Sequence, residues 1–392
     1  MSNPINVLII CHDHGMSGAN RSLADWLADI DRRVLNPIIV LPRHNEDTER
    51  IFADLGCKVY VGNYRFDVYH FGPVAFSRKL KDIIGHIVSL LANGKVLRDL
   101  EQVIEAESID IVHTNSYSCL IGAQLAQHVG LPHVWHVREF MDVDHEIRHF
   151  SQSLVRQLSS YSTAIFISDV IANYHLERVG FSDYSIIYNK VAYKDYPRKR
   201  SFMDDGICRL LIAGTIQPGK GQDQAIAAVL RLKEKGYPVE LVICGQKNSD
   251  YIDRQIDGSH SPTIQYLGLR NDVDSIRQGI DIALICSKYE AFGRVTVEAM
   301  YQRNLVVASN CGCNKRLVIE GSTGFLYEWG NTDSLCDVLE KCIQAGPQLN
   351  GVVEAAHEFA VNSFSTGIAE RITNVYKQEL GLSSVQTMSG DC

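Results

Sequence analysis

Two glutamates lie in a segment that has the features of a phosphate-binding site. The apolar run Ile282–Cys286 is typical of a buried strand, and it leads into a loop with Gly293 and then into a helical pattern. The first amides of a helix have no intrahelical acceptor and carry the positive end of its dipole, so this junction favours an anion. Glu290 in the loop and Glu298 in the helix are placed to reach sugar or ribose hydroxyls. The structural alternative is a favourable interaction of each carboxylate with the helix dipole.

A lysine in a glycine-rich loop is the next candidate. Lys220 stands in the sequence Pro-Gly-Lys-Gly after the strand pattern Cys208–Ala213. A fixed cation there would stabilise the negative charge of a departing diphosphate, whereas a lone lysine in a loop is more often a solvated surface residue. Gly15 and Gly18 follow the first strand pattern, where glycine lets the backbone approach a phosphate. No G-x-G-x-x-G motif is followed by an acid about 20 residues later, which disfavours a nicotinamide-dependent enzyme.

Two successive series of strand and helix patterns would position these residues. Short β-rich apolar runs alternate with amphipathic stretches, which is typical of parallel sheets buried on both faces. The first series has strand patterns at Asn6–Cys11, Pro37–Leu41, Lys58–Val61, Ile109–His113, His133–Val137, Ala164–Ser168 and Ser185–Tyr188, with helices that begin near Ala19, Glu46, Ser118 and Val170. The second has strand patterns at Cys208–Ala213, Val239–Cys244, Ile264–Leu267, Ile282–Cys286, Leu305–Ala308 and Gly324–Tyr327.

A charged stretch with one proline separates the two series. We therefore predict two doubly wound α/β domains that face a central cleft, an N-terminal domain over residues 1–195 and a C-terminal domain over 207–364, joined by a linker over 196–206. Residues 365–381 are predicted to form a helix and the polar residues 382–392 a disordered tail. Ligands of such sheets bind beyond the carboxyl ends of the strands.

Composition excludes several classes of partner. The 392 residues include 38 basic and 46 acidic ones, and the net charge of −8 argues against a nucleic-acid partner. No apolar stretch approaches the roughly 18 residues of a spanning helix, and no signal peptide is evident, so we expect a soluble, cytoplasmic protein. The 11 cysteines lack zinc-type spacing and are interpreted as reduced thiols. Cys311 and Cys313, one residue apart, fit a structural loop better than a metal or redox site.

Several motifs, in order along the chain, resemble those of one enzyme family. The segment Tyr289–Met300, with seven residues between its two glutamates, closely resembles the signature of the retaining glycosyltransferases of family 4, the glycosyl transferases group 1 with the GT-B fold. Further matches lie at residues 14–23, 109–115, 186–189, 213–221 and 267–273. The resemblance implies two Rossmann-like domains, the first binding the acceptor and the second a nucleotide-diphosphate sugar. The helix over 365–381 would cross back to the first domain.

The resemblance also implies a role for each matching residue. Glu298 would accept hydrogen bonds from the donor ribose, Glu290 would lie beside the transferred sugar, and Lys220 would neutralise the diphosphate. The other donor-binding positions are Gly15, Gly18, Thr215, Arg270, Phe292, Gly293, Arg294 and Val295. No cofactor or metal is implied, because the helix dipole and the lysine take the place of a metal. The Asp-Val-Asp segments at 142–144 and 272–274 are therefore interpreted as loop and capping acids.

Two positions depart from the family pattern. Thr215 stands where members usually have an arginine, so one expected diphosphate cation is missing. Either Arg294 or Arg270 compensates, or catalysis is weakened. Asn189 is followed by Lys190 where the family usually has glycine, which removes the residue best suited to a positive φ.

The acceptor side is predicted at the ends of two strand patterns of the first domain. His136 either orients the acceptor or the donor sugar or is a hydrogen-bonded structural histidine. Asn115 occupies a position where related enzymes often have a catalytic-site histidine, and the neighbouring His113 does not inherit that role. Arg138 and Glu139 form either a local ion pair or contacts with the acceptor.

Together these observations predict a metal-independent, retaining glycosyltransferase that acts on a glycan or lipid-linked acceptor in bacterial polysaccharide or lipopolysaccharide synthesis. Retention follows only from the resemblance. The alternatives are a nucleotide-sugar 2-epimerase and a catalytically silent sugar-nucleotide-binding scaffold, which Thr215 allows. The aromatic and basic segment Tyr60–Lys81 either holds an acceptor, makes peripheral contact with the inner face of a membrane, or folds onto its own domain. The sequence leaves the sugar, the nucleobase and the oligomeric state open.

Overall fold

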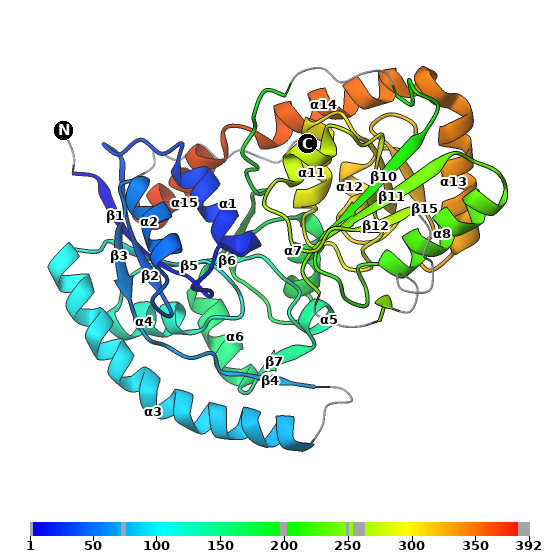
Figure 1. Ribbon diagram of the computed structural model, residues 1–392. Coiled ribbons are helices and arrows are strands. Elements are labelled where there is room, and N and C mark those ends of the chain that lie inside the picture. Colours follow the sequence, from blue (N-terminus) through cyan, green and yellow to red (C-terminus); the bar gives the residue numbers. More distant parts are fainter. Residues whose placement is uncertain (1–2, 72–75, 197–201, 248–250, 254–262, 383–392) are drawn as a thin grey trace. The chain divides into compact units, whose positions relative to one another are not determined.

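The chain divides into two α/β units in the computed structural model, which describes residues 3–71, 76–196, 202–247, 251–253 and 263–382 (Figure 1). The first unit contains the described residues up to Lys190 and those from Thr366 onward, and the second runs from Val191 to Ser365. The division therefore precedes the linker that the sequence predicts at 196–206. Residues 197–201 of that linker, and the predicted tail from residue 383 onward, lie outside the described residues.

A parallel sheet of seven strands, in the order β3-β2-β1-β5-β6-β8-β9, forms the centre of the first unit. A separate antiparallel pair joins β4 to β7. The strands are β1 (Ile5–Ile10), β2 (Leu35–Leu41), β3 (Lys58–Val61), β4 (Val68–His70), β5 (Ile111–Thr114), β6 (His133–Val137), β7 (Ile147–His149), β8 (Thr163–Phe166) and β9 (Asp183–Ile186). The helices are α1 (Gly18–Leu27), α2 (Glu46–Asp54), α3 (Phe76–Glu107), α4 (Ile121–Val129), α5 (Asp142–His145), α6 (Gln152–Tyr161), α7 (Asp169–Leu176) and α15 (Ile368–Glu379).

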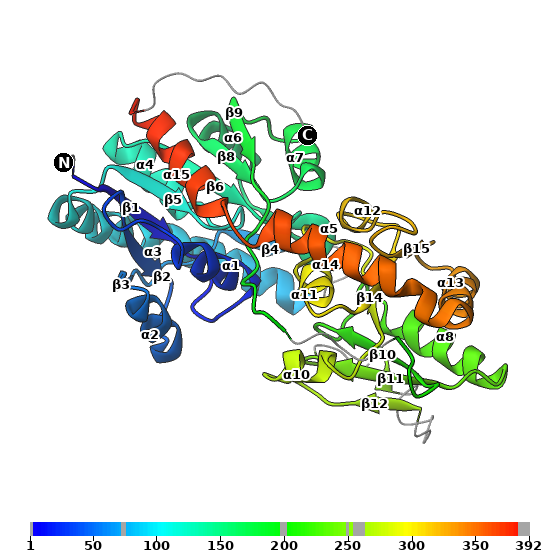
Figure 2. The same ribbon diagram turned by 90° about the horizontal axis from the view of Figure 1, so that it is seen from above.

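Both faces of this sheet are buried by helices. Successive side chains of β1 point to opposite faces, so Val7 and Ile9 pack in one core with α1, α2 and α15, and Leu8 and Ile10 pack in another with α3 and α4. Helix α15 lies beside α1 (Figure 2). Its residues Ile372 and Tyr376 are completely buried. The last helix of the chain is thus part of the core of the first unit.

The second unit has a parallel sheet of six strands in the order β12-β11-β10-β13-β14-β15. The strands are β10 (Cys208–Ala213), β11 (Val239–Cys244), β12 (Ile264–Tyr266), β13 (Ile282–Ile285), β14 (Leu305–Ser309) and β15 (Phe325–Tyr327). The helices are α8 (Gln222–Glu234), α10 (Val273–Arg277), α11 (Arg294–Tyr301), α12 (Asn314–Leu317), α13 (Thr332–Ala345), the 3₁₀ helix η1 (Gly346–Leu349) and α14 (Asn350–Phe364). Its main core joins one face of the sheet to α8 and α13.

The order of the strands reverses once in each main sheet. In the first unit the chain builds outward from β1 to β3 and then returns to the other side of β1 with β5; in the second, β10 lies between β11 and β13 in the same way. Loops that leave adjacent strands at such a switch point diverge and open a crevice at their carboxyl ends. The loops with Gly15 and Asn115 follow β1 and β5, and those with Lys220 and Glu290 follow β10 and β13. Each unit therefore places its candidate residues at its own switch point.

The predicted fold class is confirmed, and the predicted strand patterns correspond to strands of the two main sheets. The expected helices do not include α3, α5 or α6, and the β4–β7 pair was not predicted. The interpretation of residues 142–144 as loop and capping acids is wrong, because they belong to α5. Helix α3 has apolar residues on two opposite faces, so no single apolar stripe marks it in the sequence.

The aromatic segment before α3 is folded largely onto the first unit. The hydroxyl of Tyr64, a buried residue, donates to the Val40 carbonyl oxygen at 3.1 Å, and the Tyr60 hydroxyl donates to Glu107 at 2.6 Å. Tyr69 packs on the ring of Phe150. Of the three interpretations of this segment, packing onto its own domain accounts for these side chains; residues 72–75 lie outside the described residues.

Several histidines of the first unit have a lowered pKa. Burial, which disfavours the charged imidazolium, is the largest cause in each case. The residues are His12, His113, His133, His136, His149 and His175. The pKa of His133 is lowered to about 3 and that of His175 to about 4. These rings are therefore neutral in the folded protein at neutral pH.

Acid should destabilise the first unit through these histidines. In the unfolded chain they take up protons as the pH falls through about 6.5, whereas the folded unit keeps them neutral to lower pH, so stability falls below pH 6.5 by about 1.4 kcal/mol per pH unit for each histidine. A Trp329→Phe variant retains only Trp26 and Trp135, both in the first unit, as fluorescent reporters. We expect its urea midpoint to be lower at pH 5.5 than at pH 7.5. Adding His133→Gln should reduce the pH dependence of the free energy of unfolding by about one proton. An unaltered dependence would show that His133 does not contribute to the acid destabilisation.

Candidate functional site

The loop after β10 lies directly against the loop after β13 in the second unit. The amide of Lys288 donates to the Gly219 carbonyl oxygen at 2.7 Å. A Cβ atom on Gly221 would come within 2.3 Å of the Cys286 carbonyl oxygen, and Gly221 has a φ of 73°. Glycine is therefore required at position 221 both for space and for backbone conformation.

This contact brings two of the predicted residues together. Lys220 Nζ lies 3.7 Å from Glu290 Oε2 and 3.5 Å from Ser287 Oγ. Both charged side chains are partly exposed, so the ammonium is paired loosely and stays accessible from solvent. A cation and a carboxylate thus stand side by side at the carboxyl ends of β10 and β13.

The Cys311–Cys313 segment packs against the backbone of the loop that carries Glu290. The Cys313 amide donates to the Glu290 carbonyl oxygen at 2.8 Å. A Cβ on Gly312, whose φ is 55°, would lie 2.5 Å from that oxygen and 2.7 Å from the Glu290 nitrogen. Ser309 Oγ donates to the Ser287 carbonyl oxygen at 2.6 Å. This packing explains why the two closely spaced cysteines belong to a structural loop.

Gly293 directs the chain from this loop into α11. It is the N-cap residue with a φ of 96°, and a Cβ there would lie 2.5 Å from Leu317 Cδ1. Gly293 makes no side-chain capping hydrogen bond to the first turn of the helix, which includes Val295. The ring of Phe292 is buried and packs against Phe364, which orients the backbone that precedes Gly293. The predicted anion-binding junction is therefore present as a helix N-terminus behind a glycine turn.

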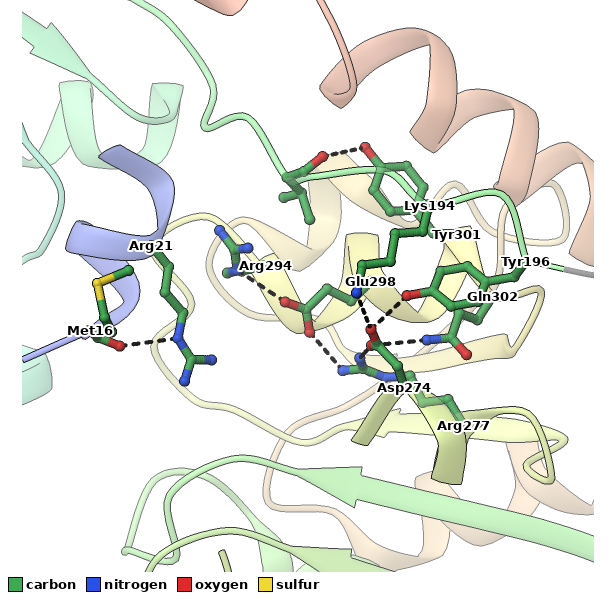
Figure 3. A network of polar contacts seen from close by, with 11 residues as sticks. Met16, Arg21, Lys194, Tyr196, Asp274, Arg277, Arg294, Glu298, Tyr301 and Gln302 are labelled. Carbon is green, nitrogen blue, oxygen red and sulfur yellow. Dashed lines mark hydrogen bonds and ion pairs between the residues drawn. The ribbon is translucent and has the colours of Figure 1, made fainter. Parts of the chain in front are cut away.

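Glu298 is held by two arginines (Figure 3). Its Oε1 accepts from Arg294 Nε at 3.0 Å and its Oε2 from Arg277 Nη2 at 2.8 Å. Each carboxylate oxygen has two lone-pair positions, so Glu298 keeps acceptor capacity for further donors. Arg294, one of the two candidates to replace the missing arginine at Thr215, donates its Nε to Glu298.

Arg277 is a functional candidate that the sequence analysis missed. Its side chain is only 2% exposed and also lies 3.4 Å from Asp274 Oδ1. Asp274 in turn accepts from Gln302 at 3.1 Å and from the Tyr196 hydroxyl at 2.6 Å (Figure 3). Burial, followed by this hydrogen bond, raises the pKa of Tyr196. The sequence feature that could have indicated Arg277 is its i, i+3 spacing from Asp274 in one short helix.

Arg270, the other candidate to replace the missing arginine, is bound within its own loop. Its Nε donates to Asp272 Oδ1 at 2.7 Å, and this pair lowers the pKa of Asp272. Asp272 stands at the N-cap position of α10 but makes no capping hydrogen bond, which corrects the capping role given to it. The described residues contain no group of three or more histidine, cysteine, aspartate or glutamate side chains arranged to hold a metal ion.

Thr215 lies in the same loop as Lys220. Its carbonyl oxygen accepts from Gln222 Nε2 at 3.0 Å, so the backbone of Thr215 is tied to the start of α8. The residue before it, Gly214, has a φ of 147°. Nothing in these contacts replaces the positive charge that an arginine would bring to this position.

In the first unit a buried asparagine fixes the glycine-rich loop after β1. Asn20 Nδ2 donates to the carbonyl oxygens of Asp13 at 2.9 Å and Gly15 at 2.7 Å. A Cβ on Gly18 would meet no atom within 4 Å, and one on Gly15 would lie 3.9 Å from Asp13. Neither glycine has a positive φ. Both therefore leave open space above the loop, and Asn20, which the sequence analysis did not single out, positions it.

Arg138 connects three predicted positions of the first unit. Its Nε donates to Asn115 Oδ1 at 2.9 Å, its Nη2 to His136 Nδ1 at 3.1 Å, and its Nη1 to Asn189 Oδ1. Glu139 uses different partners, because its Oε1 accepts from the Ser118 amide at 2.9 Å and from the Ser116 hydroxyl. Asn115, His136 and Arg138 are thus one hydrogen-bonded group at the ends of β5 and β6.

His136 accepts a hydrogen bond from Arg138 in this group. A guanidinium only donates, so His136 Nδ1 must accept, and the ring proton lies on Nε2. Burial, and then the charge of Arg138, lower the pKa of His136 far below its usual value. Within the described part of the chain its Nε2 has no hydrogen-bond partner. His136 therefore has a neutral, buried N–H donor at this position rather than a base.

Lys190 does not need the glycine that the family pattern has there. Its φ is negative, and its side chain is buried in an ion pair with Asp29. The structure therefore does not require a positive-φ residue at position 190, and the lysine is accommodated.

Comparisons with known proteins agree with this arrangement. A family model described as Glycosyl transferases group 1 matches residues 198–359. The phosphatidyl-myo-inositol mannosyltransferase of Mycolicibacterium smegmatis is 25% identical over 232 residues, which are 58% of this chain and 60% of that protein. The D-inositol 3-phosphate glycosyltransferase of Corynebacterium diphtheriae is 25% identical over 177 residues, which are 43% of this chain and 42% of that protein. The chain thus matches three fifths or less of the length of these two relatives.

A solved structure shows the same fold over nearly the whole chain. HepE of Anabaena, crystallised in complex with UDP, aligns with 95% of this chain and 100% of its own, with a TM-score of 0.75 and 20% identity. Two doubly wound α/β units of this kind define the GT-B fold, as predicted. The match to the glycosyl transferases group 1 model covers 162 of the 392 residues and falls in the second unit.

The packing of Gly312 against Glu290 can be tested with two matched glycines. Gly312 and Gly321 both have a positive φ, but a Cβ on Gly321 would meet no atom within 4 Å. Gly321→Ala should therefore cost only about 1 kcal/mol of backbone strain, whereas Gly312→Ala should cost about 2 kcal/mol or more because it also displaces the Glu290 backbone. Urea unfolding followed by circular dichroism measures both. Equal losses would show that the contact with Glu290 is not a tight one.

Proposed function

We propose that this protein transfers a sugar from a nucleoside diphosphate sugar to the hydroxyl of an acceptor, with retention of anomeric configuration and without a metal ion. The observation that carries the proposal is the position of Lys220, 3.7 Å from Glu290 at the carboxyl ends of β10 and β13. The N-terminus of α11 begins four residues after Glu290, behind Gly293. These groups have the charges that a sugar diphosphate requires.

The chemistry explains why a cation belongs here. When the bond between the sugar and the diphosphate breaks, negative charge develops on the departing phosphate oxygen. The ammonium of Lys220 and the first amides of α11 would stabilise that charge in the transition state. The loose pairing with Glu290 leaves the ammonium able to turn toward a phosphate. Glu290 would then accept hydrogen bonds from hydroxyls of the transferred sugar.

Glu298 would bind the ribose of the donor. Arg277 and Arg294 each occupy one side of its carboxylate, and the remaining lone pairs would accept the two ribose hydroxyls. The buried Arg277 restricts the rotation of the carboxylate, so that Glu298 is oriented before the nucleotide arrives. Because HepE was crystallised with UDP, uridine nucleotides are the first donors to test.

The acceptor side is assigned to the first unit, where the His136 N–H and the Glu139 carboxylate would contact a glycan or lipid-linked acceptor. The relatives from Mycolicibacterium and Corynebacterium are both named for inositol-containing substrates, which supports a polyol acceptor. We propose front-face displacement in which the departing phosphate helps to remove the acceptor proton, because no residue stands out in the sequence as a nucleophile. The anomeric proton coupling of the product, measured by NMR, tests retention.

A sugar-nucleotide-binding scaffold without catalysis is the second candidate. It is favoured by Thr215, since no arginine replaces the missing cation beside Lys220 and both candidate arginines are bound to carboxylates. Such a scaffold would bind the donor with normal affinity and show neither transfer nor hydrolysis. A 2-epimerase would instead convert the free nucleotide sugar without any acceptor.

Replacing Glu298 by alanine should weaken the binding of UDP by about 1 to 3 kcal/mol, because a charged hydrogen-bond partner of the ribose is lost. Isothermal titration calorimetry with UDP, with EDTA present, measures the change. Glu354→Ala is the matched control, since it breaks the ion pair with Arg303 in the same unit at 3.0 Å. Unchanged affinity of Glu298→Ala, or an equal loss in both variants, would refute the ribose role.

Replacing Lys220 by alanine should lower kcat by about 100-fold, the loss typical of a removed transition-state donor, and should change donor affinity by less than about tenfold. Release of UDP from a panel of UDP-sugars with mixed glycan acceptors measures turnover. Lys235→Ala is the control, because Lys235 caps α8 at its C-terminal end and bonds to Glu340. Full activity of Lys220→Ala would place the diphosphate elsewhere, and loss of activity on chelation would overturn metal independence.

A further inference from the structure

Helix α3 is apolar on two opposite faces. Its inner face packs on α4 and β4, with Val96 and Leu100 buried. Its outer face leaves a row of large apolar side chains in solvent. The members of this outer apolar stripe are Leu80, Ile83, Ile84, Ile87, Leu90 and Leu91, each of which is between 48% and 77% exposed. In Figure 1 α3 is the long helix at the edge of the first unit.

The outer apolar stripe is continuous. At 100° per residue its six members fall within an arc of about 120°, and they extend along about 16 Å of the helix. The buried residues Val96 and Leu100 lie on the opposite side of the same helix. Single exposed apolar residues are common on protein surfaces, but an uninterrupted row of this length is typical of a surface that contacts a partner.

Lysines border the stripe on both sides. Lys79 lies at one edge, and Lys81 and Lys95 lie at the other; all three are exposed. Residues 76–95 hold four basic residues and one acid, Asp82, which makes the segment +3 in a chain of net charge −8. Asp82 lies away from the stripe and pairs with Arg78 at 3.5 Å and with His70 at 3.3 Å. The surface around the stripe is therefore both apolar and positive.

We propose that the outer face of α3 binds an anionic phospholipid surface. The helix would lie parallel to the membrane plane, with the outer apolar stripe among the upper acyl chains and the lysine ammonium groups at the lipid phosphates. Insertion across the bilayer is a different mode, for which no described helix has the length and hydropathy. A second copy of the chain fits less well, because stripes paired face to face would bring lysines opposite lysines.

The binding surface is independent of the proposed transfer reaction, since α3 contributes none of the residues assigned to the donor or acceptor. The two proposals therefore fail separately. If the protein transfers sugars, the surface would hold it where membrane-bound acceptors lie.

Vesicle sedimentation tests the proposal. The protein should sediment with vesicles that contain phosphatidylcholine and phosphatidylglycerol at 7:3, and at least tenfold less with phosphatidylcholine alone or in 0.5 M NaCl, because the lysines contribute through screened charge. Ile87→Glu should lower binding to the mixed vesicles at least tenfold. The matched control is Ile319→Glu, because Ile319 in the second unit has the same 53% exposure as Ile87.

Further measurements distinguish loss of the binding surface from loss of the fold. Ile87→Glu should unfold at the same urea midpoint as the wild type and bind UDP equally, since Ile87 lies on the outer face. Failure of the wild type to bind the mixed vesicles, or equal loss in both glutamate variants, would overturn the proposal. So would a dimer in size-exclusion chromatography that Ile87→Glu converts to a monomer, because a second copy would then cover the stripe. The double variant Lys79→Ala/Lys81→Ala should reduce binding while leaving the apolar stripe intact.

Discussion

The close approach of two loops in the second unit is the constraint on which the candidate donor site depends. The loop after β10 can reach the loop after β13 only because Gly221 has no side chain to collide with the Cys286 carbonyl group. The same requirement recurs at Gly312, which lies against the backbone of Glu290. These glycines set the position of the backbone, and the backbone sets where Lys220 and Glu290 stand. Two glycines, which have no reactive side chain, therefore determine where the charged groups of the site lie.

A buried arginine in each unit is the second organising feature of the structure. In the second unit the buried Arg277 is neutralised by carboxylates, Asp274 and Glu298, because an unpaired buried charge is costly. In the first unit the buried Arg138 has neutral hydrogen-bond partners that include Asn115 and a histidine. Burial and the positive field of Arg138 keep that histidine uncharged. One arginine therefore orients a carboxylate, while the other creates an N–H donor.

The sequence predicts what is encoded locally. Apolar runs buried on both faces predicted the strands, because a central parallel strand must be apolar on every side chain. Glu290, Glu298 and Lys220 were predicted because each follows a strand in a recognisable motif. Arg277 and Asn20 were missed, since their importance arises from partners that only the tertiary structure brings near. Helix α3 was missed for a different reason, because a helix with two apolar faces lacks the single stripe that identifies an amphipathic helix.

Helix α3 also shows that the net charge of a whole chain does not describe the charge of one part of its surface. A net charge of −8 argues against a chain that depends on anionic partners, and the argument holds for a charge spread evenly over the surface. Electrostatic attraction, however, is screened within about 8 Å at physiological salt, so a membrane responds to the residues that face it rather than to the total charge. Residues 76–95 carry +3 beside an exposed apolar stripe. The distribution of charge along α3, and not the composition of the chain, is therefore the property that decides whether this protein binds an anionic membrane.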